Sequence, residues 1–435
     1  MRRNHSTQKL LAILALTLAW PGAIPTANAE AETLQQAWDA ALAANRSLKA
    51  ARENTASSAS SLAAAKSARL PTVWVAAGYT ALDNTQALNA NMLGQSLQVP
   101  MAPDNSASYA AMASIPLYTG GRIQHGIDAT AALLEASRQD ELSHAQSLKM
   151  GVSEAYVTVL RAARMLKVAE SHVRSLEAHS HDVEDLFTQG MAVKTDSLSV
   201  QVALADARQK ALQAANGLDL SRAAYNRLLA RPLDQAVELE ELTPENNVEA
   251  FPILAGRAIA QRSELTAMDS QIEAVRNQAK VVRGENRPQV ALSGGYNYQE
   301  NPYQAHESQW VVKLGARWNL FDGSLISNRA DAVERMAAAL AEQRAELVSI
   351  VSLQVRQAWL DIEETHRRIE VTQSSIALAE ENLQVVRDRY KNGFSSHTEV
   401  LDAETLRLNS ETSYANALYD SVLAGLRLKR ATGEL

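Results

Sequence analysis

The sequence predicts a mainly helical chain with a small β contribution, in which a unit of helix, two strands, long helix and helix occurs twice. Three observations predict this fold. Segments recur in the same order along the chain, long stretches contain no proline, and short segments alternate apolar and polar residues. Aromatic residues make up only 5% of the 435 residues. That composition suits long helices in close contact better than a large mixed core.

The repeat keeps its register over most of the chain, which a chance match would not do. The shift is 217 positions at first and 203 afterwards, and the missing residues fall near 91–106. That stretch reads as a loop because it is rich in Asn, Pro and Ser. The matched pairs are 69–73 with 286–290, 117–120 with 320–323, Gly190 with Gly393, and Leu198 with Leu401.

Residues 1–29 read as a secretory signal peptide. Basic residues are followed by an apolar run that ends at Trp20, and Ala27–Ala29 forms a small-x-small cleavage site. The apolar run is too short to cross a bilayer as a helix. Cleavage would leave a mature net charge of about −10, which argues against a nucleic-acid partner. Cysteine is absent, which excludes disulfides, thiolate metal sites and a cysteine nucleophile.

Local signals divide the chain into two copies joined by a linker. A capping box at Thr33 opens the first helix, which is expected to break near Asn45. Pro71 and Pro288 end the helices before them. The expected units are residues 30–231 (strands about 71–82 and 108–119, helices about 122–187 and 195–229), a linker at 232–252, and residues 253–435 (strands about 288–299 and 308–321, helices about 325–390 and 397–431).

The strands have the length and alternation of tilted membrane strands. In the segment 310–320, Trp310 and Trp318 belong to the apolar set, whereas Lys313 and Arg317 belong to the polar set and are expected to line a barrel lumen. Four strands cannot close a barrel, because small closed barrels begin at about eight. Strands in lipid would therefore need several chains. The alternative is a sheet resting on a helical core.

The helices after the strands are exceptionally long. The segment 122–187 would extend about 100 Å at 1.5 Å per residue, which fits a rod or tube better than a globular domain. An apolar stripe follows one face of this segment and recurs in the second copy. Its members are Val152, Tyr156, Val159, Leu166 and Val173, matched by Val355, Trp359, Ile362, Ile369 and Ile376.

Over the whole mature chain the arrangement resembles the TolC-like outer-membrane efflux proteins. The motifs that carry the resemblance are 390–393 (Tyr-Lys-Asn-Gly), 399–403 (Glu-Val-Leu-Asp-Ala), the C-terminal 431–435, and the first-copy segment 187–190 with Asp196 and Leu198. The resemblance implies a homotrimer whose twelve strands form one outer-membrane β-barrel. It also implies an α-barrel that crosses the periplasm to a periplasmic adaptor and an inner-membrane transporter.

The resemblance also implies roles for residues near the two helix reversals. Gly190 and Gly393 would form the tip turns that dock on the adaptor. Thr195, Asp196 and Tyr390 would belong to a hydrogen-bond network that keeps the tip closed. The basic residue that the family often places two positions after the second turn glycine is here Ser395, so Lys194 or Lys391 would have to replace it.

Two acidic residues lie just past the second turn, three positions apart and therefore on one helix face. In a trimer, Glu399 and Asp402 would form acidic rings that select cations. The alternative for Glu399 is a capping box with Ser396, and Asp402 is alternatively a solvated surface residue.

No catalytic residues, cofactor or metal site are predicted. His172 and His179 share a helix face near His181 but have no third ligand at helical spacing, and His366 is expected to pack on the apolar stripe. The predicted function is a passive outer-membrane export duct of a tripartite efflux pump or type I secretion system. A periplasmic coiled-coil adaptor or scaffold is the alternative, and an enzyme is the least favoured reading. The cargo and the class of pump stay open.

Overall fold

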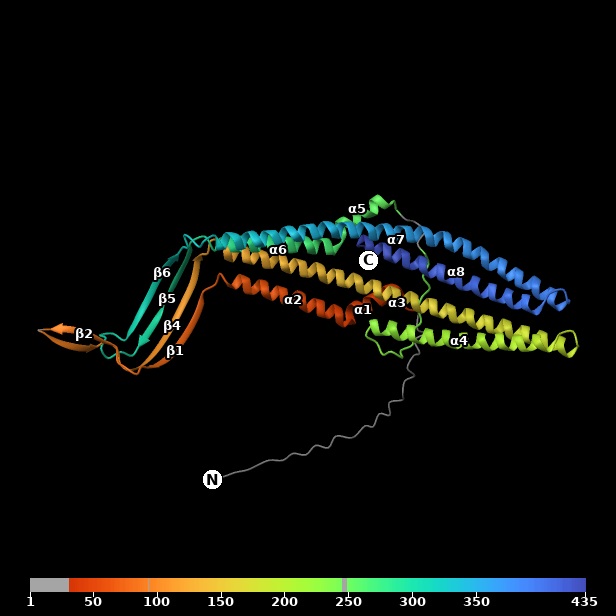
Figure 1. Ribbon diagram of the computed structural model, residues 1–435, viewed down its shortest axis with the longest axis horizontal. Coiled ribbons are helices and arrows are strands. Elements are labelled where there is room, and N and C mark those ends of the chain that lie inside the picture. Colours follow the sequence, from red (N-terminus) through yellow and green to blue (C-terminus); the bar gives the residue numbers. More distant parts are fainter. Residues whose placement is uncertain (1–30, 93, 245–248) are drawn as a thin grey trace, which may run out of the picture.

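The computed structural model describes residues 31–92, 94–244 and 249–435. The predicted signal peptide therefore lies outside the described residues. The molecule is long and narrow, with the sheet at one end and the reversals of two helical hairpins at the other (Figure 1). Within the described ranges, no helix is both long and apolar enough to cross a membrane.

The helices confirm the predicted capping signals. Thr33 caps the first helix through a capping box with Gln36, and Asn45 separates the first two helices by capping the second one. The helices are α1 (Leu34–Ala44), α2 (Arg46–Ser67), α3 (Arg122–Thr188), α4 (Lys194–Leu228), α5 (Phe251–Gln261), α6 (Ser263–Gly284), α7 (Leu325–Lys391) and α8 (His397–Thr432).

Four strands form the main sheet, as the sequence predicts. They are β1 (Thr72–Ala81), β4 (Asn105–Tyr118), β5 (Gln289–Gln299) and β6 (Ser308–Arg317), in the order β1-β4-β5-β6 and antiparallel throughout. The central pair β4 and β5 joins the two copies, and β1 and β6 form the edges of the sheet.

The two copies begin their elements at matched positions. α1 and α5, α2 and α6, and β1 and β5 start 217 positions apart, whereas β4 and β6, α3 and α7, and α4 and α8 start 203 positions apart. The change of shift falls between the first and second strand of each copy, where the sequence also changes register.

The expectation of a plain loop at 91–106 is wrong. Two short strands, β2 (Ala87–Met92) and β3 (Gln95–Pro100), pair as a hairpin that extends beyond the main sheet (Figure 1). Gly94 lies in its turn with φ +81°, a conformation that glycine adopts without steric cost. Asn and Gln residues alternate here with single apolar residues, so the segment carries few of the β-branched and aromatic residues that would predict a strand.

Two expected boundaries also differ. β6 ends at Arg317 rather than continuing to residue 321, because Arg317 pairs with Gln289, the first residue of β5. Pro288 precedes Gln289 and has no N–H group to extend the ladder. The linker expected at 232–252 is shorter, because α5 already begins at Phe251 with a proline in its first turn.

The predicted apolar stripe forms the core of the helical part. Val152, Tyr156 and Val159 are buried in a cluster that α1, α4 and α8 complete with Ala41, Tyr225 and Tyr419 among others. The Tyr156 hydroxyl donates to the carbonyl oxygens of Glu32 and Glu240, at 2.6 and 2.8 Å. The second-copy stripe packs in the same way against α5 and α8. The largest buried cluster therefore lies midway along the helices.

Candidate functional site at the helical tip

Both predicted tip glycines lie in the reversals. Gly190 lies between α3 and α4 with φ +74°, and Gly393 lies between α7 and α8 with φ +77°. The next residues close the turns, since the N–H of Met191 donates to Leu186 and that of Phe394 to Arg389, each at 2.8 Å. The left-handed conformation ends each helix at little cost only because the residue is glycine.

A buried apolar cluster joins the four helices just behind the turns. Its members are Val183 of α3, Val200 of α4, Leu383 and Tyr390 of α7, and Val400 and Ala403 of α8. The two hairpins are therefore packed together at the tip. An opening at this end has to break apolar contacts, at a cost of about 25 cal/mol per Å² exposed.

The start of α8 is more firmly capped than that of α4. Ser396 and Glu399 form the predicted capping box, and the Ser395 hydroxyl also donates to Glu399 Oε2 at 2.5 Å. Hydrogen bonds from Ser395 and Ser396 hold the pKa of Glu399 below its usual value. Val193 precedes α4 as its N-cap residue and makes no side-chain cap. Asp402 lies on the same face one turn beyond Glu399 and is exposed.

Tyr390 is nine-tenths buried, and its ring packs edge-on against His179 with 5.5 Å between ring centroids. Burial, followed by the charges of Asp196 and Asp182, raises the pKa of its phenol. Among the described residues the Tyr390 hydroxyl has no hydrogen-bond partner. The predicted tie of Tyr390 with Asp196 and the exposed Thr195 is therefore not formed as a hydrogen bond in this structure, and its role in closure stays a prediction.

A polar seam between the hairpins was missed from the sequence. We define the hairpin seam as the contacts of α3 with α7 and α8 made by His172, Ser175, His179 and Asp182 of α3, Arg387 and Lys391 of α7, and His397 and Glu404 of α8.

Glu404 is the central carboxylate of the hairpin seam, with a side chain that is 1% exposed. It accepts from the Ser175 hydroxyl at 2.8 Å and is bound by the guanidinium of Arg387. Burial alone would raise its pKa, but His172, Arg387 and Ser175 offset burial and leave the pKa of Glu404 lowered. Repeat register gives no signal for this contact, because it joins the first copy to the second across an α3–α8 interface.

The histidines singled out from the sequence have separate partners. His172 Nδ1 lies 3.7 Å from Glu404 Oε2, and the exposed His181 lies 3.7 Å from Asp185. His179 contacts His397, and His366 is half-buried, near the stripe. Within the described ranges no three His, Asp or Glu side chains converge as metal ligands.

The sheet has one apolar and one polar face. Rows across all four strands run Val73, Ala113, Gly294, Val312 and Val75, Ala111, Tyr296, Trp310 on the apolar face. On the other face Lys313 shares a row with Ser293, Ser114 and Thr72, and Arg317 pairs with Gln289. Trp310 and Val312 are about four-fifths exposed. The sheet is thus a single layer with an uncovered apolar face.

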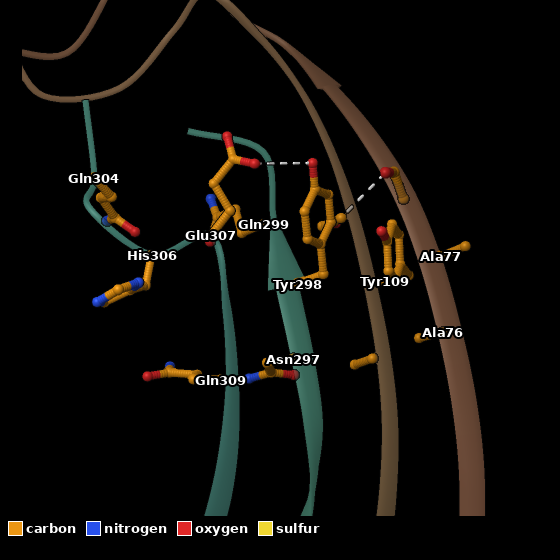
Figure 2. A pocket seen from close by; sticks show the side chains of 13 residues that line it. Ala76, Ala77, Tyr109, Asn297, Tyr298, Gln299, Gln304, His306, Glu307 and Gln309 are labelled. Atoms are coloured by element: carbon orange, nitrogen blue, oxygen red, sulfur yellow. Dashed lines mark hydrogen bonds between the residues drawn. The ribbon is translucent and has the colours of Figure 1, made fainter. Parts of the chain in front are cut away.

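Figure 2 shows the end of the sheet farthest from the helices. Gln304, His306 and Glu307 of the β5–β6 connection line a hollow of about 500 Å³, which Asn297 of β5 and Gln309 of β6 also line. The Tyr298 hydroxyl donates to Glu307 Oε2 at 3.2 Å. Four of the thirteen lining residues carry amide side chains and only one carries a carboxylate, which suits a hydrated mouth better than a specific ligand site.

The family model described as "Outer membrane efflux protein" matches residues 37–231 and 254–434. The chain is similar to the outer membrane protein TolC of Escherichia coli, at 20% identity over 427 residues that cover 93% of this chain and 83% of that protein.

Solved structures are similar over most of their length. The outer membrane protein VceC of Vibrio cholerae superposes with a TM-score of 0.78 at 16% identity, covering 92% of this chain and 96% of that one. The outer-membrane channel OprN superposes with a TM-score of 0.77 at 21% identity, covering 92% and 90%. At these identities the superpositions show a common fold.

Proposed function

This chain belongs to the outer membrane efflux protein family and lies in the outer membrane, and from that premise we propose that it is one subunit of a homotrimeric export duct. The duct conducts passively from the periplasm to the exterior. A periplasmic adaptor and an inner-membrane transporter would supply the cargo and the energy, as the family resemblance implies.

The open sheet is the observation that carries this proposal. β1 and β6 leave unpaired edges, and a sheet edge in lipid leaves N–H and C=O groups without partners at several kcal/mol each. The exposed apolar face of Val73, Val75, Trp310 and Val312 fits contact with lipid tails. Pairing β6 of one chain with β1 of the next removes every edge.

The size of the lumen argues against two chains, and the family resemblance implies three. Two chains would give eight strands, and a barrel of that size is filled by its own side chains. Three chains give twelve strands and leave an aqueous lumen lined by the polar face, with Lys313 and Arg317. The long hairpins would continue this lumen as an α-barrel, in which exposed apolar residues of α4 such as Val202 and Leu212 meet neighbouring chains.

The helical tip is the proposed gate. The turns at Gly190 and Gly393 would dock on the adaptor, and Tyr390 with Thr195 and Asp196 would keep the tip closed. Asp402 and Glu399 would face the entrance as acidic rings. Support comes from the convergence of all these residues at one end of the molecule, with the apolar cluster behind them.

Labelling of single cysteines tests the duct, since the chain has no cysteine of its own. Val312→Cys and Lys313→Cys are adjacent but lie on opposite faces of β6. After reconstitution, a polarity-sensitive label at position 312 should be quenched by brominated lipid tails, whereas a label at 313 should be quenched by aqueous iodide. Cross-linking in native membranes should give trimers. Equal aqueous quenching at both positions, or a dominant monomer, contradicts the proposal.

A further inference from the structure

Two buried imidazoles join the hairpins close to the tip. Nε2 of His179 in α3 lies 3.2 Å from Nδ1 of His397, the first residue of α8. The rings are stacked, with centroids 5.3 Å apart and planes 11° from parallel. The two residues are 2% and 6% exposed. They belong to different copies of the repeat, so the contact exists only while the two hairpins are together.

The histidine pair differs chemically from the rest of the hairpin seam. Glu404, two turns further along α8, is matched by the cation of Arg387, and Asp182 is matched by Lys391 at 3.0 Å. Within the described part of the chain, neither imidazole is paired directly with a carboxylate. Nε2 of His397 is buried and without a hydrogen-bond partner among the described residues. A positive charge at this contact would therefore be poorly compensated.

Every element packed around the pair contributes a titratable or charged group. Burial, then the neighbouring His397 and Arg387, lower the pKa of His179 to about 4, although Glu404 and Asp182 act in the opposite direction. Burial lowers the pKa of His397, against the charge of Asp196. The full set is Asp182 of α3, Asp196 of α4, Arg387, Tyr390 and Lys391 of α7, and Glu404 of α8.

We propose that His179 and His397 form a proton-sensitive tie between the two hairpins, which holds the tip closed while both imidazoles are neutral and releases it in acid. One imidazole must donate and the other must accept. When both rings are protonated, all four ring nitrogens carry hydrogen, no acceptor remains, and two cations face each other in a buried site. The assignment of the tip as the gate rests on the proposed function, whereas the tie itself does not.

The direction of the pH dependence follows from the lowered pKa values of the two imidazoles. An imidazole freed into water when the tip opens titrates near 6.5, above its value in the closed state. The closed state is therefore fully favoured above about pH 6.5 and loses stability as pH falls toward 4. Each pH unit in that window shifts the equilibrium by up to tenfold per imidazole. At pH 5 the open-to-closed ratio should rise by up to about thirtyfold for one histidine.

Distance measurements between the hairpins test the tie without requiring conductance. Met191→Cys and Phe394→Cys place spin labels on the exposed residues that follow the two tip glycines. The full-length protein is used in detergent, with labelled chains diluted so that a trimer carries one labelled protomer. When the pH falls from 7.5 to 5, the distance between the labels at 191 and 394 should lengthen, or its distribution should broaden. Adding His179→Phe, which keeps an aromatic ring in the stack, should remove the contribution of His179 and leave at most that of His397, so the response should be clearly smaller.

The matched control is His181→Gln. His181 lies two residues from His179 on α3, but its side chain is 79% exposed. The control should keep the acid response of the parent protein. An unchanged distance at pH 5 in the parent, an equal response in His179→Phe, or a response that disappears with a chelator would overturn the proposal, the last by indicating a bound metal in place of a proton. Failure of the duct would appear separately, as a missing conductance with the acid response intact.

Discussion

Nζ of Lys391 at the end of α7 lies 3.0 Å from Oδ2 of Asp182 in α3. This ion pair joins the two hairpins close to the tip. The family resemblance implies a basic residue two positions after Gly393. Ser395 occupies the expected position, and its hydroxyl instead donates to Glu399. Lys391 at the end of α7 therefore places a cation near the tip, and its part in keeping the tip closed stays a prediction.

Replacing Lys391 by Gln should loosen the closed tip modestly. Both side chains are more than a third exposed, so we expect a loss of under about 1 kcal/mol, or a rise of the open-to-closed ratio by about two- to fivefold. Single-channel recording in planar bilayers at low and high salt measures it. The difference from the parent should vanish in high salt, because solvent-exposed pairs are screened. Lys194→Gln in the first-copy turn is the matched control and should have less effect.

Tyr390 should act through its ring rather than its hydroxyl. Because the hydroxyl is buried without a hydrogen bond, Tyr390→Phe removes an unsatisfied group and should leave the tip closed. Tyr390→Ala removes the ring from His179 and from the apolar cluster and should raise the conductance, more so when combined with Asp196→Ala. Bilayer conductance of the three variants distinguishes a role of the Tyr390 ring from a role of its hydroxyl. If Tyr390→Phe alone raised the conductance, the hydroxyl would have to bind Asp196 in the closed tip.

The sequence predicted the elements whose signals are local. Proline placement, the Thr33 and Ser396 capping boxes and the alternation around Lys313 lie within a few residues of what they specify, and each matches the structure. The repeat added the register of the second copy, since one set of boundaries constrained the other.

Contacts between the two copies could not be predicted, because no local signal specifies residues that are far apart in the sequence. His179 and His397 are 218 positions apart, which fits neither repeat shift, so no pattern connected them. Their meeting depends on how α3 packs against α8. The β2–β3 hairpin was missed because its strands carry few residues with a preference for strands. The end of β6 depended on where its partner strand began.

The sheet should fail when Gly295 gains a side chain. A Cβ there would collide with the carbonyl oxygen of Ala111 and lie 2.7 Å from Sδ of Met112. Gly295→Ala should therefore separate β4 from β5 and reduce the amount of trimer in membranes severalfold. Gly315→Ala is the control, because a Cβ at that β6 position meets nothing within 4 Å. Native-gel analysis of membrane extracts measures both. Equal trimer yields would mean that β4 can shift to accommodate the methyl group.

Acid should weaken the joint between α6 and α8 only below about pH 4.5. Glu264 accepts from Arg430 at 2.6 Å and from Arg262 at 3.0 Å. Burial opposes ionisation, but the two guanidiniums lower the pKa of Glu264 to about 2. A lowered pKa gives stability that is present above the usual value and is lost as pH falls toward 2. From this lowering of the pKa, we expect the ionised Glu264 to contribute about 3 kcal/mol to the free energy of unfolding at neutral pH.

Thermal unfolding of Glu264→Gln checks this. The Tm deficit relative to the parent should be largest at pH 7 and should shrink between pH 4.5 and 3. Glu249→Gln removes an exposed partner of Arg257 and serves as the control, with a small deficit at every pH. A deficit of Glu264→Gln that stays constant down to pH 3 would show that the carboxylate is not what stabilises this joint.

Asp402 should contribute more to cation selectivity than Glu399 does. Glu399 is occupied by Ser395 and Ser396, and its capping box fixes the start of α8. Asp402 is exposed one turn further along and takes no part in the capping box. In a trimer its three carboxylates would gather in the narrow entrance, where a ring of like charge selects cations and binds multivalent ones.

Asp402→Ala should therefore move the reversal potential toward zero in a salt gradient and weaken block by a trivalent cation by about tenfold or more, with trimer yield unchanged. Glu399→Gln should do less, because Gln still completes the capping box. The variant that carries both substitutions shows whether the two carboxylates act together. Additive effects would place them in independent rings, whereas a combined effect smaller than the sum would place them in one shared site. If Asp402→Ala leaves selectivity and block as they are in the parent, Asp402 is a solvated surface residue outside the pore.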